Sequence, residues 1–431
     1  MNKFMDVLER LVVPLSQKLA TNKVLQGISK GLMAMMPVSM GGAVAAILAS
    51  LPIDGYQAFL ASSGIGEVLN KAVDVTTNLL AVYASFSIAY SYVKNEGGNS
   101  FAAGLISLLS FFLVTPITVT GEGWAAVKNM PFDWLGAKGL FVAMFVGIIT
   151  AVIYMALIRK NITIKMPDSV PEFVSKSFAG VIPAVVILSI FVIITIIVNM
   201  TPFGNLHDII YTLIGKPLTG IGTSLPATLL IYSLCGLCWF FGVHGIAVIS
   251  VVMPIWMAAD AENLAAYTAG VANSELPNII TYGWTNLVSC IGGAGATLGL
   301  MIWLFLRSRS EQYKTLGKLC IVPGLFNINE PLVFGMPCVL NTTLFIPFVF
   351  GQPILLAIAY FLTKIGLLAR VTGIGAPAGT PILINGFISG GWTMVLFQIF
   401  AIVFSLVLYY PFFKILDKQA LEAERETITS K

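Results

Sequence analysis

The charged residue with the most unusual setting in this sequence is Glu330. Residues 319–363 contain no other Asp, Glu, Lys or Arg. A carboxylate at mid-membrane costs about 2.5–3.5 kcal/mol on insertion scales, which makes Glu330 a candidate functional residue. It follows Asn327 and Asn329 and precedes Pro331, so amide groups and a proline-freed backbone surround it. This set suits a hydroxyl-rich ligand; the alternative is that Glu330 only ties down local backbone.

The second candidate is His244, which lies in residues 217–259, a run without Asp, Glu, Lys or Arg. Gly242 and Gly245 flank it and let the backbone bend and approach a ligand closely. A satisfied core imidazole would be the ordinary interpretation of a lone histidine in apolar surroundings. The companion segment around Glu330 favours a role at a ligand instead.

Aromatic and glycine-rich positions are further candidates for contacts with a sugar. An aromatic face complements the C–H face of a pyranose ring, although tryptophan is also favoured at membrane interfaces. The glycine-rich segment 373–379 predicts either a loop that approaches the ligand or a simple turn. The candidates are Trp239, Trp256, Trp284, Trp392, Tyr282, Gly379 and Thr380.

No other pattern indicates a metal, a cofactor or a redox centre. The five cysteines stand in apolar surroundings and are interpreted as buried small side chains. Cys235 and Cys238 have CxxC spacing, but no further metal ligands lie nearby in the sequence. The glycines at 292–295 follow no strand, so close helix packing explains them better than dinucleotide binding. His207, in a loop with Gly, Asn and Asp, is expected at the surface.

The elements that must position these residues are membrane helices. Hydrophobic side chains make up 57% of the 431 residues and charged ones 10%, with a mean hydropathy of +0.89, whereas soluble domains carry about 25% charge. The apolar runs are far longer than the roughly 10 residues of an outer-membrane strand. The sequence therefore predicts an all-α integral membrane protein, and its net charge of +4 does not indicate nucleic-acid binding.

The first half predicts five plain crossings that begin in the cytoplasm. The apolar runs are 31–51, 72–93, 101–120, 139–158 and 178–200, each about 20 residues and long enough to span a bilayer. Basic residues cluster before the first run, around 307–318 and after 413, which places both termini in the cytoplasm. Residues 1–27 predict an amphipathic helix on the lipid surface.

The second half predicts broken helices. The long runs 217–259 and 319–363 would each be about twice the hydrocarbon thickness as one helix, so we expect re-entrant hairpins near 233–256 and 319–340. Broken elements of this kind mark substrate sites in transporters. We expect a five-helix scaffold or dimerisation half at 28–200, a substrate-binding half at 201–413 and a cytoplasmic tail at 414–431. That gives about ten transmembrane helices, with a loop around 260–277.

The sequence resembles the membrane (IIC) component of bacterial sugar phosphotransferase systems of the lactose/cellobiose/diacetylchitobiose family. The resemblance covers nearly the whole chain. It rests on the Gly-Val-His-Gly segment that ends at Gly245, on Asn-Ile-Asn-Glu-Pro with the following Phe334-Gly335, and on Ala-Pro-Ala-Gly-Thr-Pro at 376–381. The Asn-Glu-Pro segment is the most specific of these.

The resemblance implies a multi-pass homodimer in the bacterial cytoplasmic membrane. The substrate half would bind a β-linked disaccharide outside, most simply diacetylchitobiose or cellobiose, and carry it inward by an elevator-type rigid-body motion. Glu330 and His244 would hydrogen-bond the hydroxyl to be phosphorylated. A IIB protein, itself phosphorylated by IIA, would donate the phosphoryl group from a phosphocysteine. It would be a separate chain, because no such domain is expected in this one.

Two alternatives come from other functional classes. In a proton-coupled secondary sugar transporter, Glu330 and His244 would be a proton-coupling pair and the sugar would stay unmodified. A membrane-embedded hydrolase would need a metal-ligand set or a nucleophile constellation, and a lone His and Glu in separate hairpins supply neither.

Overall fold

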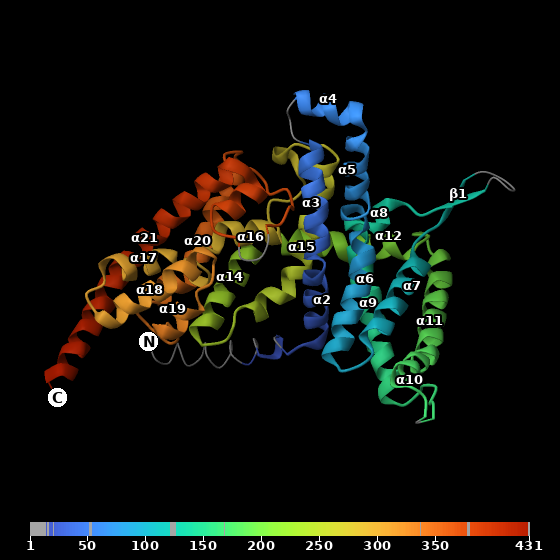
Figure 1. Ribbon diagram of the computed structural model, residues 1–431, viewed down its shortest axis with the longest axis horizontal. Coiled ribbons are helices and arrows are strands. Elements are labelled where there is room, and N and C mark those ends of the chain that lie inside the picture. Colours follow the sequence, from blue (N-terminus) through green and yellow to red (C-terminus); the bar gives the residue numbers. More distant parts are fainter. Residues whose placement is uncertain are drawn as a thin grey trace. The chain divides into compact units, whose positions relative to one another are not determined.

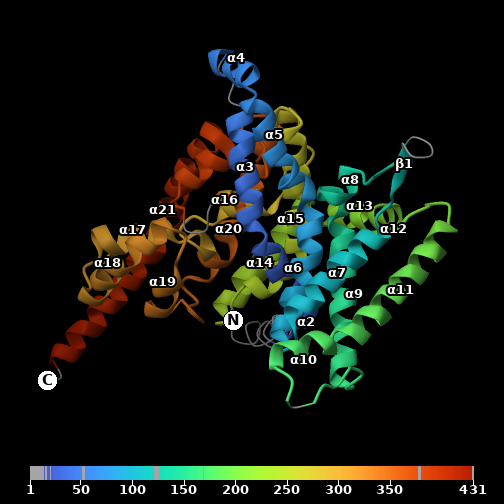
Figure 2. The same ribbon diagram turned by 45° about the vertical axis from the view of Figure 1, so that its right-hand side comes forward.

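The computed structural model is helical, with one small β-hairpin in the part of the chain it describes (Figures 1 and 2). The described residues are 14, 17–19, 21–50, 54–120, 126–167, 169–336, 338–376 and 380–429. Among them, six helices are long and apolar enough to cross a membrane, and two bent helix pairs bring the number to as many as eight. The all-α membrane fold is confirmed, and the count of ten stays a prediction.

The chain divides into two compact units. The N-terminal unit consists of Thr21–Ile221 and Met253–Val271, and the C-terminal unit consists mainly of Gly222–Val252 and Ala272–Lys431. The boundary at Val252 falls inside one helix, α15 (Ile246–Thr268), just before Pro254. The expected division at residue 200 concerns functional halves and stays a prediction.

The N-terminal unit contains most of the plain helices. Its elements are α2 (Lys23–Ala34), α3 (Met36–Ser50), α4 (Asp54–Ser63), α5 (Ile65–Asp74), η1 (Thr77–Leu79), α6 (Leu80–Asn95), α7 (Ser100–Val114), β1 (Thr118–Thr120), β2 (Val127–Asn129), α8 (Phe132–Leu135), η3 (Ala137–Gly139), α9 (Leu140–Arg159), α10 (Glu172–Ala179), α11 (Val181–Asn199), α12 (Leu206–Ile210), the π-helix η4 (Tyr211–Gly215) and α13 (Lys216–Gly222).

Helix α6 is the centre of this unit and packs against α2, α7 and α9 (Figure 1). Small residues permit the close approach. A Cβ atom on Gly31 would lie 2.5 Å from the Cα atom of Ile88, and one on Gly147 would lie 3.0 Å from the Ile88 side chain. Ile88 itself is fully buried. Close backbone contact through small residues is how membrane helices gain packing energy without a hydrophobic driving force.

The run expected to cross the membrane at 101–120 ends earlier than predicted. Helix α7 stops at Val114, and Thr118–Thr120 pairs antiparallel with Val127–Asn129, with Thr118 opposite Asn129. Pro116 accounts for the stop, because a residue that precedes proline avoids the helical region, and the β-branched residues that follow favour a strand.

The C-terminal unit contains shorter and more broken elements. They are α14 (Leu225–Phe240), the first part of α15, η5 (Asn273–Glu275), α16 (Tyr282–Ser289), η6 (Ala294–Ala296), α17 (Leu298–Arg307), α18 (Glu311–Leu325), α19 (Glu330–Gly335), α20 (Phe345–Lys364) and α21 (Ile384–Thr429). Helix α21 bends at Gly391, whose φ is +67°, and packs along α17 and α16 (Figure 2).

The loop expected around 260–277 is helical over its first part, so that prediction is wrong there. Helix α15 continues to Thr268, and Ala258 and Ala261 pack into the core of the N-terminal unit. The carboxylates of Asp260 and Glu262 suggested a loop, but both residues make interactions within the fold. Alanine-rich sequence favours helix strongly enough to continue past them.

Two carboxylates from the end of α21 cap the beginning of α18. Asp417 accepts hydrogen bonds from the Ser308 hydroxyl at 2.5 Å and from the backbone N–H of Arg309 at 3.0 Å. Glu424 accepts from the Ser310 hydroxyl at 2.6 Å and from the Gln312 N–H at 3.0 Å. Negative groups are favourable at a helix N-terminus, where backbone N–H groups lack partners.

Glu96, at the end of α6, holds together three elements of the N-terminal unit. Its side chain is 6% exposed and pairs with Lys23 at 2.9 Å and with Arg159. The hydrogen bond from Lys23 has the largest effect and lowers the pKa of the Glu96 carboxyl below its usual value of 4.5. Arg159 lowers this pKa as well, whereas desolvation raises it.

The ion pairs of Glu96 predict a pH-dependent contribution to stability. Because the folded-state pKa is lowered, the contribution is complete above pH 4.5 and is lost as the pH falls through the folded-state value. We expect Glu96→Gln to lower the Tm of the purified protein by a few degrees at neutral pH, and the difference from wild type to disappear in acid. Glu67→Gln, at an exposed carboxylate of α5, is the matched control, and an equal Tm loss in both variants would contradict the prediction.

Candidate functional site

Glu330 lies at a break between two helices of the C-terminal unit. Helix α18 ends at Leu325, and Glu330 is the first residue of the short helix α19, followed by Pro331. Proline is tolerated in the first turn, where its missing N–H costs nothing. The Glu330 side chain is exposed, and no residue within the described ranges forms a hydrogen bond or an ion pair with its carboxylate. The carboxylate is therefore available to a ligand.

The two asparagines beside Glu330 bind a second turn of the chain. Asn329 is 3% exposed, and its Nδ2 donates to the Ala294 carbonyl at 2.7 Å and to the Thr297 hydroxyl at 3.0 Å. The Oδ1 atom of Asn327 accepts from the Gly292 N–H at 3.0 Å. These contacts, which we call the asparagine clamp, fix the backbone on which Glu330 stands.

The turn held by the asparagine clamp differs in part from its predicted structure. Gly292, Gly293 and Gly295 all have positive φ, from +74° to +86°, so the glycines form a turn between α16 and α17. Close helix packing holds for Gly295, where a Cβ atom would lie 2.6 Å from the Phe348 ring of α20. A Cβ atom on Gly293 would lie 2.6 Å from the Asn329 amide. Three glycines in four residues were the signal for a turn. Sequence reasoning missed Thr297 altogether.

His244 lies in the turn 241–245 between α14 and α15. Its ring is exposed, packs on Trp239 with the centroids 4.3 Å apart, and accepts at Nδ1 from the Ile246 N–H at 3.2 Å. A neutral ring that accepts at Nδ1 carries its proton on Nε2. Gly242 takes φ +77°, which permits the tight turn.

The turn that carries His244 contacts the segment that follows α19, the helix that Glu330 begins. The Leu340 N–H donates to the Phe240 carbonyl at 2.9 Å, and a Cβ atom on Gly242 would lie 3.3 Å from the Val339 side chain. Partial desolvation lowers the pKa of His244 from its usual value of 6.5, and the Glu330 carboxylate acts in the opposite direction. A neutral imidazole that donates through Nε2 and an unpaired carboxylate therefore belong to one electrostatic environment.

Three of the four tryptophans considered as sugar contacts have different settings, and the fourth, Trp256, is fully buried. Trp239 is 7% exposed and contacts His244. Trp284, in α16, is fully buried, and its indole N–H has no partner among the described residues. Trp392 is 71% exposed and packs on Phe387 with the centroids 5.0 Å apart. In this conformation Trp239 lies beside a predicted site residue, His244.

The glycine-rich segment is described in part. Gly379 lies outside the described residues, whereas Thr380 is half-buried and makes interactions within the fold. Next to it, the Ile382 N–H donates to the Leu325 carbonyl at 2.9 Å. This bond joins the segment to the last residue of α18, close in sequence to the asparagine clamp.

The prediction that His207 lies at the surface is wrong. His207 is fully buried, its Nε2 lies 3.1 Å from the Thr115 hydroxyl, and its ring contacts Phe111 and Trp134. Asn205 caps α12 by accepting from the Asp208 N–H. The polar residues that suggested a loop therefore start a helix, and that helix turns the ring of His207 into the core.

The cysteines carry no sign of a redox or metal centre. Four of the five are buried and Cys290 is half-buried; all are free thiols. Among the described residues, no group of three or more His, Cys, Asp or Glu side chains is placed to hold a metal ion.

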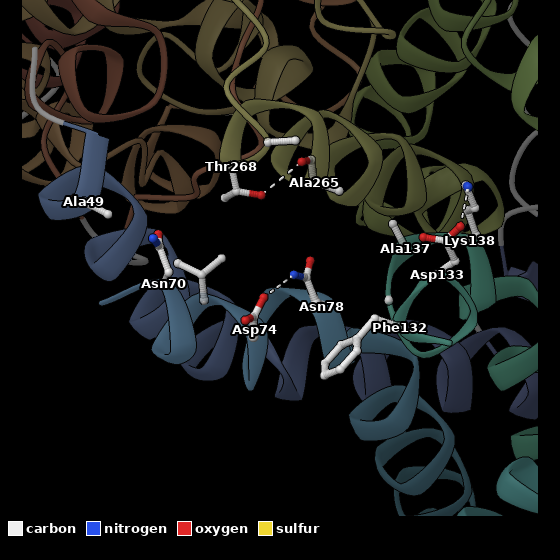
Figure 3. A pocket seen from close by; sticks show the side chains of 13 residues that line it. Ala49, Asn70, Asp74, Asn78, Phe132, Asp133, Ala137, Lys138, Ala265 and Thr268 are labelled. Carbon is white, nitrogen blue, oxygen red and sulfur yellow. Dashed lines mark hydrogen bonds and ion pairs between the residues drawn. The ribbon is translucent and has the colours of Figure 1, made fainter. Parts of the chain in front are cut away.

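A cavity of about 530 Å³ lies in the N-terminal unit, and its lining includes none of the predicted site residues. Figure 3 shows Asp74 and Asn78 on one side and Ala265 and Thr268 on the other. The polar groups are largely paired with each other: Asn78 donates to Asp74 at 2.9 Å, and Lys138 pairs with Asp133 at 3.2 Å. This self-satisfied lining offers no group poised for chemistry.

Comparison with known proteins gives consistent matches over the whole chain. The family model described as "Phosphotransferase system, EIIC" matches residues 29–351. The lichenan permease IIC component of Bacillus subtilis (strain 168) is 38% identical, covering 99% of this chain and 96% of that protein. The cellobiose-specific EIIC component of Geobacillus stearothermophilus is also 38% identical, covering 99% and 97%.

A solved structure is similar in fold as well as in sequence. The crystal structure of the transporter ChbC, the IIC component from the N,N'-diacetylchitobiose-specific phosphotransferase system, has a TM-score of 0.89 and 36% identity to this chain. The match covers 97% of this chain and 99% of ChbC.

The asparagine clamp predicts that Asn329 is needed for stability. Asn329→Ala leaves the half-buried Ala294 carbonyl and the buried Thr297 hydroxyl without this donor, and we expect a loss of about 1–3 kcal/mol in the free energy of unfolding, visible as a lower Tm. Variants at Asn327, whose φ is +62°, test the backbone conformation of the clamp separately. Asn327→Gly should be milder than Asn327→Ala by about 1 kcal/mol, because only glycine adopts this conformation freely. Equal stability of all three variants would contradict the clamp.

Proposed function

This chain belongs to the phosphotransferase system EIIC family, and from that premise we propose that it is the sugar permease for a β-linked disaccharide. As a member of this family with several apolar spans, it is a multi-pass membrane protein of a sugar phosphotransferase system. The observation that carries the site assignment is the exposed, unpaired carboxylate of Glu330 on a backbone fixed by the asparagine clamp.

The proposed substrates are cellobiose and N,N'-diacetylchitobiose. The names of the two similar transporters, one cellobiose-specific and one from the diacetylchitobiose system, support this class. Both sugars present a ring hydroxyl that can be phosphorylated. Lactose remains a third candidate from the family resemblance, and the competition order in a binding experiment distinguishes the three.

Glu330 and His244 are proposed to bind the reacting hydroxyl from two sides. The carboxylate accepts the hydroxyl proton in a hydrogen bond, and the Nε2–H of His244 donates to the hydroxyl oxygen. Trp239, which already packs on His244, supplies an apolar surface beside the sugar. Asn327 and Asn329 act indirectly, since their side chains bind the glycine turn.

Phosphoryl transfer uses a separate IIB protein that carries a phosphocysteine. The sugar oxygen forms a bond to phosphorus while the S–P bond breaks, the cysteine leaves as a thiolate, and the hydroxyl proton passes to water. Phosphoryl transfer depends mainly on positioning and charge stabilisation. We therefore assign Glu330 the role of orienting the hydroxyl, because the departing thiolate does not demand a strong base.

Transport is proposed to follow an elevator-type motion of the substrate half within a homodimer. The sugar binds from outside, the substrate half moves, and phosphorylation inside prevents return. Both termini are assigned to the cytoplasm, where IIB, charged by IIA, meets the bound sugar. The basic clusters at 307–318 and after residue 413 support this orientation through the positive-inside rule.

Equilibrium binding tests the site. Labelled diacetylchitobiose should bind the purified protein, with cellobiose and lactose as competitors. Loss of a charged hydrogen bond in Glu330→Gln should weaken binding about 10- to 100-fold, and His244→Ala should weaken it about tenfold. Glu275→Gln, at another exposed carboxylate of the C-terminal unit, is the matched control. Undiminished binding in Glu330→Gln would make Glu330 structural and overturn the assignment.

Vesicle uptake tests the reaction. Proteoliposomes loaded with phosphorylated IIB should accumulate sugar phosphate, and vesicles loaded with unphosphorylated IIB should not. Accumulation of unmodified sugar that depends on a proton gradient would instead establish the secondary-transporter alternative. Because this readout concerns the chemical form of the sugar, it is independent of the site variants.

A further inference from the structure

A cavity of about 780 Å³ lies between α17 and α21 in the C-terminal unit, apart from Glu330 and His244. Four cations line it: Arg307 and Arg309 at the end of α17, and Lys414 and Lys418 on α21. All four side chains are exposed. The cavity thus gathers a sixth of the 24 basic residues of the chain at one place.

The single carboxylate in this lining does not neutralise the cations. Asp417 is 7% exposed and is occupied by hydrogen bonds from Ser308, Arg309 and Ser310 at the beginning of α18. Of the four cations, Lys418 lies 3.8 Å from Glu422 in an i,i+4 pair, which contributes little at an exposed site. The lining therefore keeps a net positive charge, with four cations against one carboxylate.

Aromatic side chains form the wall next to the cations. Trp303 donates its indole N–H to the Leu406 carbonyl at 2.8 Å, which fixes α17 against α21. Its ring lies 4.9 Å from that of Tyr410, and the Lys414 ammonium sits 4.5 Å above the Tyr410 ring. The Lys414 charge is thereby held in place by a cation–π contact.

The apolar lining leads into the membrane-spanning part of both helices. Leu406 and Val407 line the cavity about two turns before Lys414, and α17 is apolar up to its last residue, Arg307. Cations that follow directly on apolar turns, with Trp and Tyr at the same level, mark a membrane–water boundary. A ligand here must suit both a positive rim and an apolar wall.

We propose that this cavity binds the headgroup of an anionic phospholipid, with the phosphate between Arg307 and Lys414 and the acyl chains along Leu406 and Val407. Basic pockets between membrane helices are suited to such headgroups, and arginine binds phosphate oxygens in a forked geometry. An acidic surface of a soluble protein would pair with the cations, but it would not contact the apolar wall that continues toward the hydrocarbon.

Lipid retention by the full-length protein tests the site. The protein is reconstituted in phosphatidylcholine containing a minor fraction of phosphatidylglycerol and extracted in detergent, and bound lipid is counted by native mass spectrometry. Wild type should retain phosphatidylglycerol in preference to phosphatidylcholine. Arg307→Gln and Lys414→Gln should each reduce this retention about fivefold. Lys364→Gln, at an exposed cation that ends the apolar helix α20 outside the cavity, is the matched control.

A second variant separates a built site from diffuse charge. Tyr410→Leu keeps all four cations but removes the support of Lys414, and we expect it to reduce phosphatidylglycerol retention while Lys364→Gln does not. Equal retention by wild type, Arg307→Gln and Lys414→Gln would overturn the proposal. Displacement of the lipid by inorganic phosphate at equal concentration, or loss of IIB binding with unchanged lipid retention, would overturn it as well. Sugar binding is not expected to change, so the result is independent of the proposed function.

Discussion

The structure of the C-terminal unit depends on satisfying backbone and side-chain polar groups where apolar helices break. In hydrocarbon, no water replaces a missing hydrogen bond, so each break needs partners from elsewhere in the chain. Asn327 and Asn329 supply them for the glycine turn between α16 and α17. The same contacts leave the next residue, Glu330, without a structural partner among the described residues. One polar arrangement thus stabilises two breaks and frees one carboxylate.

The two main site residues could be predicted from the sequence because a polar side chain in a long apolar run has a large free-energy cost of membrane insertion. A carboxylate in a long apolar run and a histidine between glycines are improbable unless they are used, and both side chains prove exposed at turns between helices. The membrane fold followed from composition and run length, and the asparagines were singled out by type. Their partners were not predictable, because Ala294 and Thr297 lie 35 and 32 residues away and local patterns carry no information about such contacts.

The errors arose where tertiary contacts outweigh local signals. His207 has polar neighbours in sequence, yet its partner Thr115 lies 92 residues away and a helix cap directs its ring inward. Asp260 and Glu262 suggested a loop, yet their interactions within the fold let α15 continue to Thr268. By contrast, Pro116 and the three glycines at 292–295 were local signals for the end of a helix and for a turn. They were given too little weight because the surrounding residues are hydrophobic. Breakers inside apolar runs therefore deserve as much weight as the runs themselves.

The capping of α18 by α21 has a consequence for the order of assembly. The N–H groups at the beginning of α18 are satisfied by carboxylates that follow Ser308 by 109 residues or more. At a synthesis rate of about 5–20 residues per second, the cap is made roughly 5–20 s after the helix that needs it. Until then, the first turn of α18 has only the cap from its own Ser310, which accepts from the Tyr313 N–H. The last segment of the chain completes the unit, and a ribosome that stops before residue 417 releases a protein whose α18 has the local cap of Ser310 but not the two carboxylates.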